Sequence, residues 1–428
     1  MTASHELPSE IEKIFVVPTA NGHKSKPQKP VHLLAGALPS GLNDKGKCTP
    51  LRAGDLTSML TTVMQDPEHQ NLIRWNLMSQ DVEINGNTLS PHEQECIYIP
   101  IQQRGYDVNK RDAKDSLAAA AQENAFHPVR DYLDTIRHGD RTDITRLASV
   151  FLRPADFSGP QTIYDRMVHK TLVAAVKRAY EPGCQHDTCL VLKGNQGIKK
   201  TSFWRVLFGP FFAIFRGKIG DKDALLNVHR AWGLELGELD GITSLTHAGH
   251  LKNFLSTNED VFRAPYASKA APCPRPSIFV GSCNRGDFLY DDTGERRWWI
   301  IPCDVPSKID TEALTALRDA IWAQATADYF NGFETYLGDC DEADNTELNR
   351  DYTADNILEG PVNSFLMSHA GADYIDPNEL LDAVERTGMT TQKNQILIKD
   401  AMTRAGWSLR RGSRDQFGPS RPRNWFRT

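Results

Sequence analysis

The sequence predicts an α/β protein, and three observations support this fold class. Residues 190–208, LVLKGNQGIKKTSFWRVLF, have the pattern of a buried strand, a glycine-containing loop and a helix. Short apolar runs of the kind found in buried strands recur at 231–239 and 277–284. A long amphipathic helix is expected over 162–180, where Glu181, Pro182 and Gly183 end it. Strands that alternate with helices are typical of α/β proteins, and we expect the core to span 161–335.

The loop between this first strand and its helix has the spacing of a phosphate-binding loop. Gly194, Gly197, Lys200 and Thr201 fit the pattern G-x-x-x-x-G-K-[ST], except that Lys199 stands where a glycine is usual. In such loops backbone N–H groups and a helix N-terminus bind phosphate, the lysine reaches the phosphate oxygens and the hydroxyl holds Mg²⁺. The sequence therefore predicts ATP and Mg²⁺ as cofactors. The predicted binding residues are Gly194, Asn195, Gln196, Gly197, Ile198, Lys199, Lys200, Thr201 and Ser202.

Polar side chains at the ends of the next two apolar runs suit ATP hydrolysis. Glu235 and Glu238 lie in AWGLELGEL, and we predict that they hold Mg²⁺ with Thr201 and polarise the attacking water. Asn284 ends SIFVGSCN and is expected to orient that water. The alternatives are an edge strand with solvated acids and a simple strand-end turn, because asparagine favours turns.

Two adjacent arginines follow in DDTGERRWWII. Arg296 and Arg297 come after a turn and before an apolar strand, a position that suits an arginine finger aimed at a neighbouring subunit's γ-phosphate. Surface ion pairs are the alternative. The predicted catalytic residues are Lys200, Glu235, Glu238, Asn284, Arg296 and Arg297.

These motifs, in this order, resemble the virulence-associated E family of P-loop ATPases from phages, plasmids and genomic islands, which are related to superfamily 3 helicases. The resemblance runs from about residue 124 to 332 and includes NAFHPVRDYLDTI, GNQGIKKTS, WGLELGELDGI, FRAPYASK and FVGSCNRGDFLYDDTGERRWWII. Lys199 departs from the family's usual GxQGxGKS.

The resemblance implies an AAA+-like core that works as an ATP-driven ring, expected to be a hexamer, in the replication of a mobile element. The expected setting is the cytoplasm of a bacterial host, with single-stranded DNA in a central channel and a primase or other replication protein as a possible partner. In relatives a hairpin carries a basic residue into that channel. The corresponding interval, 251–276, gives the DNA-binding candidates Arg263, Tyr266, Lys269 and Arg275. Exposed residues without a role are the alternative.

The flanking regions complete the predicted organisation. Residues 1–50 are expected to be a disordered or extended arm, 51–160 a mainly helical domain and 336–360 an acidic linker. Helices followed by a basic hairpin within 361–428 predict a winged helix that binds DNA, with an oligomerisation or partner module as the alternative. Its candidate DNA contacts are Lys393, Arg410, Arg411, Arg414, Arg421 and Arg423.

Composition narrows the alternatives further. The net charge of −6 shows no general attraction to nucleic acid, so any DNA-binding surface must be local. No apolar run approaches the length of a membrane span, and the eight cysteines form no C-x-x-C pair. A second function stays open, that of a DNA-binding initiator or regulator that assembles with ATP but hydrolyses it weakly. A metabolite kinase is a third alternative, but it would not explain the arginines that cluster within 404–428.

Overall fold

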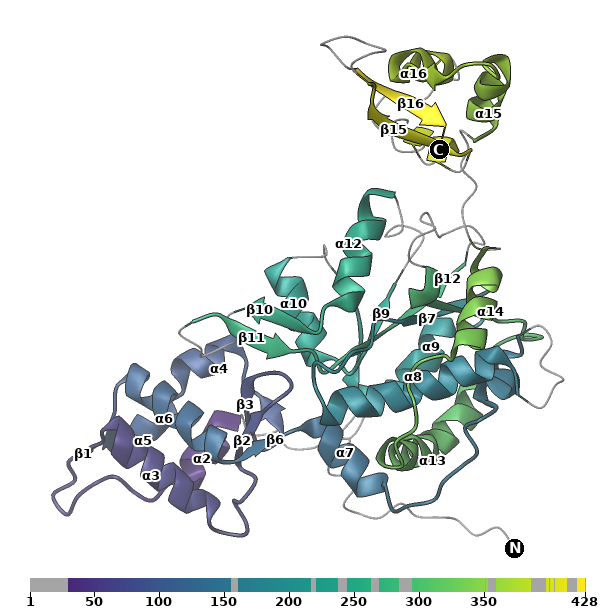
Figure 1. The fold of residues 1–428 in the computed structure, drawn as a ribbon. Helices are drawn as coiled ribbons and strands as arrows, with labels where there is room; N and C mark the ends of the chain where they lie inside the picture. Colours follow the sequence, from purple (N-terminus) through teal and green to yellow (C-terminus); the bar gives the residue numbers. More distant parts are fainter. Residues whose placement is uncertain are drawn as a thin grey trace, which may run out of the picture.

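The protein is described by a computed structural model over residues 30–154, 161–216, 221–237, 245–262, 269–284, 295–350, 352, 359–385, 398–399, 401–403, 405–413 and 422–427. Figure 1 shows a helical unit with a small sheet, formed by residues 30–126, a central unit built on a parallel sheet, and a small C-terminal unit. Mixed α/β architecture is thus confirmed.

The central sheet has five strands, all parallel. They are β7 (Cys189–Lys193), β8 (Phe212–Ile214), β9 (Gly233–Leu236), β12 (Ile278–Cys283) and β13 (Trp298–Pro302), in the order β13-β7-β12-β9-β8. Strand β12 therefore lies between β7 and β9, although it follows both in the sequence. This order brings the carboxyl ends of β7, β12 and β9 side by side.

Both faces of this sheet are covered, because its strands alternate apolar side chains toward each face. Leu190 and Leu192 point to the face covered by α8 (Ile163–Tyr180), α9 (Lys200–Phe208) and α13 (Thr311–Phe330). Cys189 and Val191 point to the face covered by α10 (Lys222–Arg230) and α12 (Leu245–Ser256). Gly233 has to be a glycine, because a Cβ there would lie 2.2 Å from the ring of Phe208.

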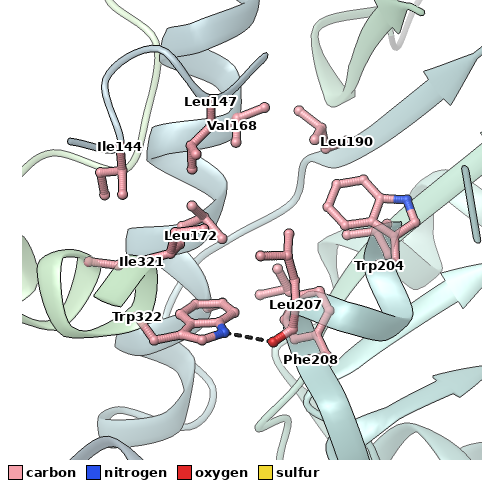
Figure 2. Close-up of a cluster of buried hydrophobic side chains, with 14 of the residues drawn as sticks. Ile144, Leu147, Val168, Leu172, Leu190, Trp204, Leu207, Phe208, Ile321 and Trp322 are labelled. Carbon is pink, nitrogen blue, oxygen red and sulfur yellow. Dashed lines mark hydrogen bonds between the residues drawn. The ribbon is translucent and has the colours of Figure 1, made fainter. Parts of the chain in front are cut away.

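The core beneath α8 and α13 is rich in tryptophan (Figure 2). Trp204, Trp232 and Trp322 are almost fully buried, and each indole N–H donates to a backbone carbonyl. The Trp322 bond to the Leu207 carbonyl, at 2.7 Å, joins α13 to α9. Burying such a side chain contributes about 1.5–3 kcal/mol, and the satisfied N–H removes the cost of burying a polar group. Helix α9, which follows the 194–201 loop, is thus fixed to β12 and α13 by buried packing and hydrogen bonds.

Side-chain caps explain why the two longest predicted helices begin where they do. Thr162 and Asp165 form a capping box at the start of α8, and the buried Asp165 carboxylate also accepts hydrogen bonds from Ser149. Asn109 caps α6 (Lys110–Glu123) by accepting from the Asp112 N–H. Such caps contribute about 1 kcal/mol each.

The N-terminal unit contains more strand than the sequence predicted. A four-stranded sheet, β4-β3-β2-β6, packs with α6 and the neighbouring helices. Its elements are α2 (Pro30–Ala37), β1 (Thr49–Pro50), α3 (Ala53–Met64), β2 (Ile73–Asn76), β3 (Asp81–Ile84), β4 (Asn87–Thr88), α4 (Pro91–Cys96), α5 (Tyr98–Gln103), β5 (Tyr106–Asp107), α6 and β6 (Ala125–Phe126). The predicted arm is wrong for residues 30–38, because Leu34 of α2 and Leu38 just after it are buried in this core.

Two predicted boundaries also differ from the structure. Helix α7 (Pro128–Ile136) and the π-helix Ala148–Leu152 bury their apolar side chains in the central core, so that unit begins before residue 161. The predicted linker contains α14 (Asp339–Arg350), and Arg166 holds Asp341 through two hydrogen bonds. Asn349 donates to the Trp298 carbonyl. Residues 337–350 therefore belong to the central unit.

The C-terminal unit has a core of its own. Its elements are α15 (Glu359–Ser368), β14 (Tyr374–Ile375), α16 (Pro377–Glu385), helical residues at 398–399 and 401–403, β15 (Trp407–Arg411) and β16 (Arg423–Arg427). The strands form an antiparallel sheet in the order β14-β16-β15. The predicted helices and hairpin thus occur, together with a first strand, β14, that the sequence did not reveal.

Candidate functional site

The loop that leads from β7 to α9 lies at the carboxyl edge of the sheet. Gly197 and Lys199 both have left-handed backbones, with φ values of 87° and 70°, and Lys199 is the N-cap of α9. The loop is tied down on each side, because the Ile309 N–H donates to the Ile198 carbonyl and the Gly194 N–H to that of Cys283. Asn195, Gln196 and Gly197 form its exposed tip.

Lys199 occupies the position where the phosphate-loop pattern has glycine. The left-handed conformation costs a residue with a side chain roughly 1–2 kcal/mol, which explains the usual glycine. Its side chain extends toward α13, where Nζ donates to the hydroxyl of Thr311, the first residue of that helix, 3.0 Å away. The substitution is therefore accommodated by turning the amine away from the loop's interior.

Lys200, by contrast, is buried at the start of α9. Its Nζ donates to the carbonyls of Gly194 (2.7 Å) and Asn195 (2.9 Å) and to Oδ1 of Asn284 (2.8 Å). The ammonium thus lies under the loop at the N-terminus of a helix. The charge of the ammonium and the partial positive charge of the helix N-terminus both favour a bound anion.

Glu235 lies next to the first turn of α9. It sits on β9 and is 1% exposed, and its Oε1 accepts hydrogen bonds from the Thr201 hydroxyl (2.9 Å) and the Ser282 hydroxyl (2.6 Å). Its Oε2 is buried, with no hydrogen-bond partner among the described residues. Burial raises the pKa of Glu235, and the hydrogen bonds from Ser282 and Thr201 oppose that rise.

These side chains surround one cavity of about 710 Å³, within the usual size of ligand pockets. It is lined by Gln196, Gly197, Lys199, Lys200, Thr201, Ser202, Ile214, Phe215, Arg216, Glu235, Gly237, Ser282 and Asn284. Ligands of open parallel sheets bind beyond the carboxyl ends of the strands, which is where this cavity lies.

The donors present fit a magnesium nucleotide. A hydroxyl beside a carboxylate with one unsatisfied buried oxygen suits Mg²⁺, which takes one or two protein ligands and fills its remaining positions with water and phosphate. Among the described residues no group of three or more His, Cys, Asp and Glu side chains gathers, so a metal cage made wholly of such side chains is absent there. Glu238, the second predicted acid, lies outside the described residues.

The predicted arginines lie at the opposite edge of the sheet. Arg296 and Arg297 precede β13, whose first residue pairs with the first residue of β7, whereas Lys200 follows the end of β7. Both face Asp187, at 4.0 and 3.6 Å. Arg297 also donates to Ser256, while the Arg296 side chain is 61% exposed. Neither arginine meets Lys200 within one subunit.

A hairpin is present in the predicted interval 251–276, but one of its candidate residues is buried and not available to DNA. Strands β10 (Glu259–Phe262) and β11 (Ala271–Pro274) pair antiparallel and project toward the N-terminal unit (Figure 1). Arg275 is 1% exposed, and its guanidinium donates two hydrogen bonds, of 2.6 and 2.7 Å, to the Asp260 carboxylate. It is therefore a structural residue at the hairpin's base, and the DNA-binding prediction for it is wrong. Lys269 is exposed, whereas Arg263 and Tyr266 lie outside the described residues.

The C-terminal candidates are partly described. Arg410, Arg411 and Arg423 are exposed on β15 and β16, and Arg411 pairs directly with Arg423 across the strands. Like charges in this arrangement repel each other, so a bound anion would stabilise the pair. Lys393, Arg414 and Arg421 lie outside the described residues.

Two cavity residues with polar side chains were missed by sequence reasoning. Ser282 lies two positions before Asn284, so period-2 alternation places both on the face that carries Glu235, and this signal was available. Arg216 follows β8, a strand that the sequence did not reveal.

Comparison with known proteins assigns the family. The profile of the virulence-associated protein E-like domain matches residues 133–354, just over half of the chain. The chain belongs to this family. The virulence-associated protein E-like domain takes in the central sheet, its covering helices and α14, so it ends within the stretch 336–360 that the sequence predicted to be a linker.

Other comparisons are more distant. The chain is similar to solved apo structures of the NrS-1 C-terminal region. One A-form structure has 10% identity and a TM-score of 0.44, covering 87% of this chain and 99% of that one. Another has 11% identity and a TM-score of 0.41, covering 86% and 98%. No curated protein gives a significant match. No helix in the described part of the chain is long and apolar enough to span a bilayer.

Proposed function

We propose that the protein is an ATP-hydrolysing DNA helicase or translocase that acts in the replication of a phage, plasmid or other mobile element. One observation carries the proposal. Lys200, Thr201, Glu235 and Asn284, from three different segments, meet around a single cavity at the carboxyl edge of a parallel sheet. Because the family resembles superfamily 3 helicases, the proposal also assigns the protein a DNA-translocating role and an AAA+-like core.

The residues divide the chemistry among them. Lys200 exchanges its bonds to the loop carbonyls for phosphate oxygens, while the N-terminus of α9 and the loop N–H groups bind the same anion. Thr201 and Glu235 would hold Mg²⁺, which neutralises charge on the β- and γ-phosphates. Asn284, already 2.8 Å from the ammonium of Lys200, is placed to orient the attacking water.

The proposal includes a ring, expected to be a hexamer. Arg296 is exposed on the edge opposite its own subunit's cavity, so it would complete the site of a neighbour. DNA would pass the exposed side of the β10–β11 hairpin in the channel and meet Arg410, Arg411 and Arg423 on the C-terminal unit, which we propose is a winged helix.

The test is DNA-stimulated ATP hydrolysis by Lys200→Ala. We expect loss of at least about 100-fold in turnover, because preorganised charge at the phosphates is removed. Lys177→Ala on α8 is the matched control, since it removes a lysine of the same unit outside the cavity. Unaltered ATP hydrolysis by Lys200→Ala would contradict the assignment of this cavity as the ATP site.

A second function is favoured by one observation. Lys199 puts a side chain and backbone strain where ATPases of this type use glycine. A DNA-binding initiator that assembles with ATP but hydrolyses it weakly would tolerate that substitution. Mass measurements with an ATP analogue and single-stranded DNA, beside ATP turnover, separate the two. Nucleotide-dependent assembly with negligible turnover supports the initiator, and assembly with DNA-stimulated turnover supports the helicase.

A further inference from the structure

Strand β12 and the residue that follows it place two polar side chains at the cavity, and each contacts a different group of the site. Asn284 accepts a hydrogen bond from Lys200, whose helix follows β7 on one side. Ser282, two residues earlier and on the same face, donates to Glu235 of β9 on the other side. The strand between β7 and β9 therefore contacts both the phosphate-binding cation and the metal-binding acid.

Ser282 acts on one oxygen of that acid. Its hydroxyl and that of Thr201 both donate to Oε1 of Glu235, at 2.6 and 2.9 Å. Two donors on one oxygen fix the plane of the carboxylate. Oε2 is then the oxygen without a partner in the described structure. The Thr201 hydroxyl donates its hydrogen bond to Glu235, so the lone pairs of its oxygen remain for a cation.

We propose that Ser282 is a positioning residue for the metal site, which orients Glu235 so that Oε2 and the Thr201 hydroxyl oxygen can serve one Mg²⁺. The inference rests on the proposed function, because it assumes that a magnesium nucleotide occupies this cavity. Ser282 is not itself a metal ligand. Its hydroxyl is committed to Glu235, much as the groups behind metal ligands orient them elsewhere.

The experiment measures Mg²⁺ binding directly as well as turnover. A fluorescent, non-hydrolysable ATP analogue is bound to the full chain, and Mg²⁺ is titrated into the complex. In Ser282→Ala we expect the Mg²⁺ concentration at half-saturation to rise about 10- to 100-fold, the usual effect of removing a group that orients a ligand. Binding of the analogue without Mg²⁺ stays unchanged, because Lys200 and the loop are untouched. Turnover at saturating Mg²⁺ recovers most of the wild-type value.

The controls separate this role from a structural one. Ser277→Ala removes a buried hydroxyl with no partner in the described structure, just before the same strand, and should leave the Mg²⁺ midpoint unchanged. Ser282→Thr keeps a hydroxyl and should stay close to wild type. If Ser282→Ala does not fold, Ser282→Cys replaces it, because a thiol is a much weaker donor of similar size.

The outcomes distinguish this inference from the proposed function. A wild-type Mg²⁺ midpoint in a folded Ser282→Ala variant overturns the positioning role and leaves the ATPase proposal standing. An equal rise in Ser277→Ala also overturns it, because strand disruption would then explain both. A wild-type protein that binds no nucleotide removes the proposed function itself, and this inference with it.

Discussion

The two edges of the central sheet use charged residues in opposite ways. At the carboxyl edge, Lys200 and Glu235 face a cavity, and Lys200 bonds to carbonyl and amide oxygens that phosphate can replace. At the amino edge, Arg275 is buried against Asp260, and Arg178 donates to the carbonyls of Arg275 and His186. An adjoining cavity, more than charge or burial, separates the site from the scaffold, because Lys200 and Glu235 are buried as these two arginines are. A basic residue in a motif-rich sequence is therefore an ambiguous signal.

The largest expected effect is on ATP turnover, and it concerns Arg296, the exposed arginine of the amino edge. If it completes a neighbour's site, Arg296→Ala should lower ATP turnover by about 10³- to 10⁵-fold, the range attributed to arginine fingers. Mixing Arg296→Ala with Lys200→Ala subunits should restore activity, because roughly a quarter of the interfaces in an equal random mixture regain both groups. Arg111→Ala, an exposed arginine of the N-terminal unit, is the control.

Absence of rescue at every mixing ratio would contradict a shared site. It would leave Arg296 as a surface partner of Asp187, from which it lies 4.0 Å away.

Next in size is the scaffold role of Arg275. Removing one member of a buried ion pair typically costs about 3–5 kcal/mol, because the other charge is left unpaired. Arg275→Ala should lower the apparent free energy of unfolding by that amount, measured by urea denaturation. Lys269→Ala, on the same hairpin but exposed, should change it by less than about 0.5 kcal/mol.

The state of Asp260 explains why that cost is high. Burial raises its pKa, but hydrogen bonds from Arg275 and His229 outweigh burial and bring the pKa to about 2. A variant Arg275→Ala that kept wild-type stability and lost DNA binding would reverse the assignment and restore Arg275 as a DNA contact.

The smallest effect is a pH dependence from the amino edge. Burial, with a smaller contribution from Arg178, lowers the pKa of His186 from 6.5 to about 3. Unfolding therefore takes up a proton below pH 6.5, and this stability is lost as the pH falls toward 3. Between pH 7 and 5 the loss should be about 2 kcal/mol, at about 1.4 kcal/mol per pH unit below 6.5.

The measurement is urea denaturation across that range, with His186→Gln as the non-titrating comparison. The variant should show a shallower decline with acid than the wild type. Equal slopes would mean that other groups cause the acid sensitivity.

Much of the central unit could be predicted because its signals are local. The caps Asn109 and Thr162 begin helices α6 and α8 at the predicted places, and β7, β9, β12 and β13 all lie in the predicted apolar runs. Helix α2 was missed because Leu34 and Leu38 bury themselves only against distant residues, in a stretch whose composition favours disorder. Helix α14 was missed because its surface is acidic and its anchor, Arg166, lies far away in sequence.

The site shows the same division. Lys200, Thr201, Glu235 and Asn284 were named from their motifs, and the structure brings all four together. What the motifs did not contain was the order of the strands. Only because β12 lies between β7 and β9 does Ser282 reach Glu235 while Asn284 reaches Lys200.

The bond between Lys199 and Thr311 also has a mechanical consequence. Thr311 is the first residue of α13, a helix of 20 residues and therefore about 30 Å long. Its far end stacks Tyr329 on Tyr180 of α8, beside Phe330. A packed helix moves as a rigid element, so a displacement of the loop at Thr311 is carried along α13 toward this aromatic cluster. The Lys199 amine therefore couples the loop to the far end of α13, about 30 Å away.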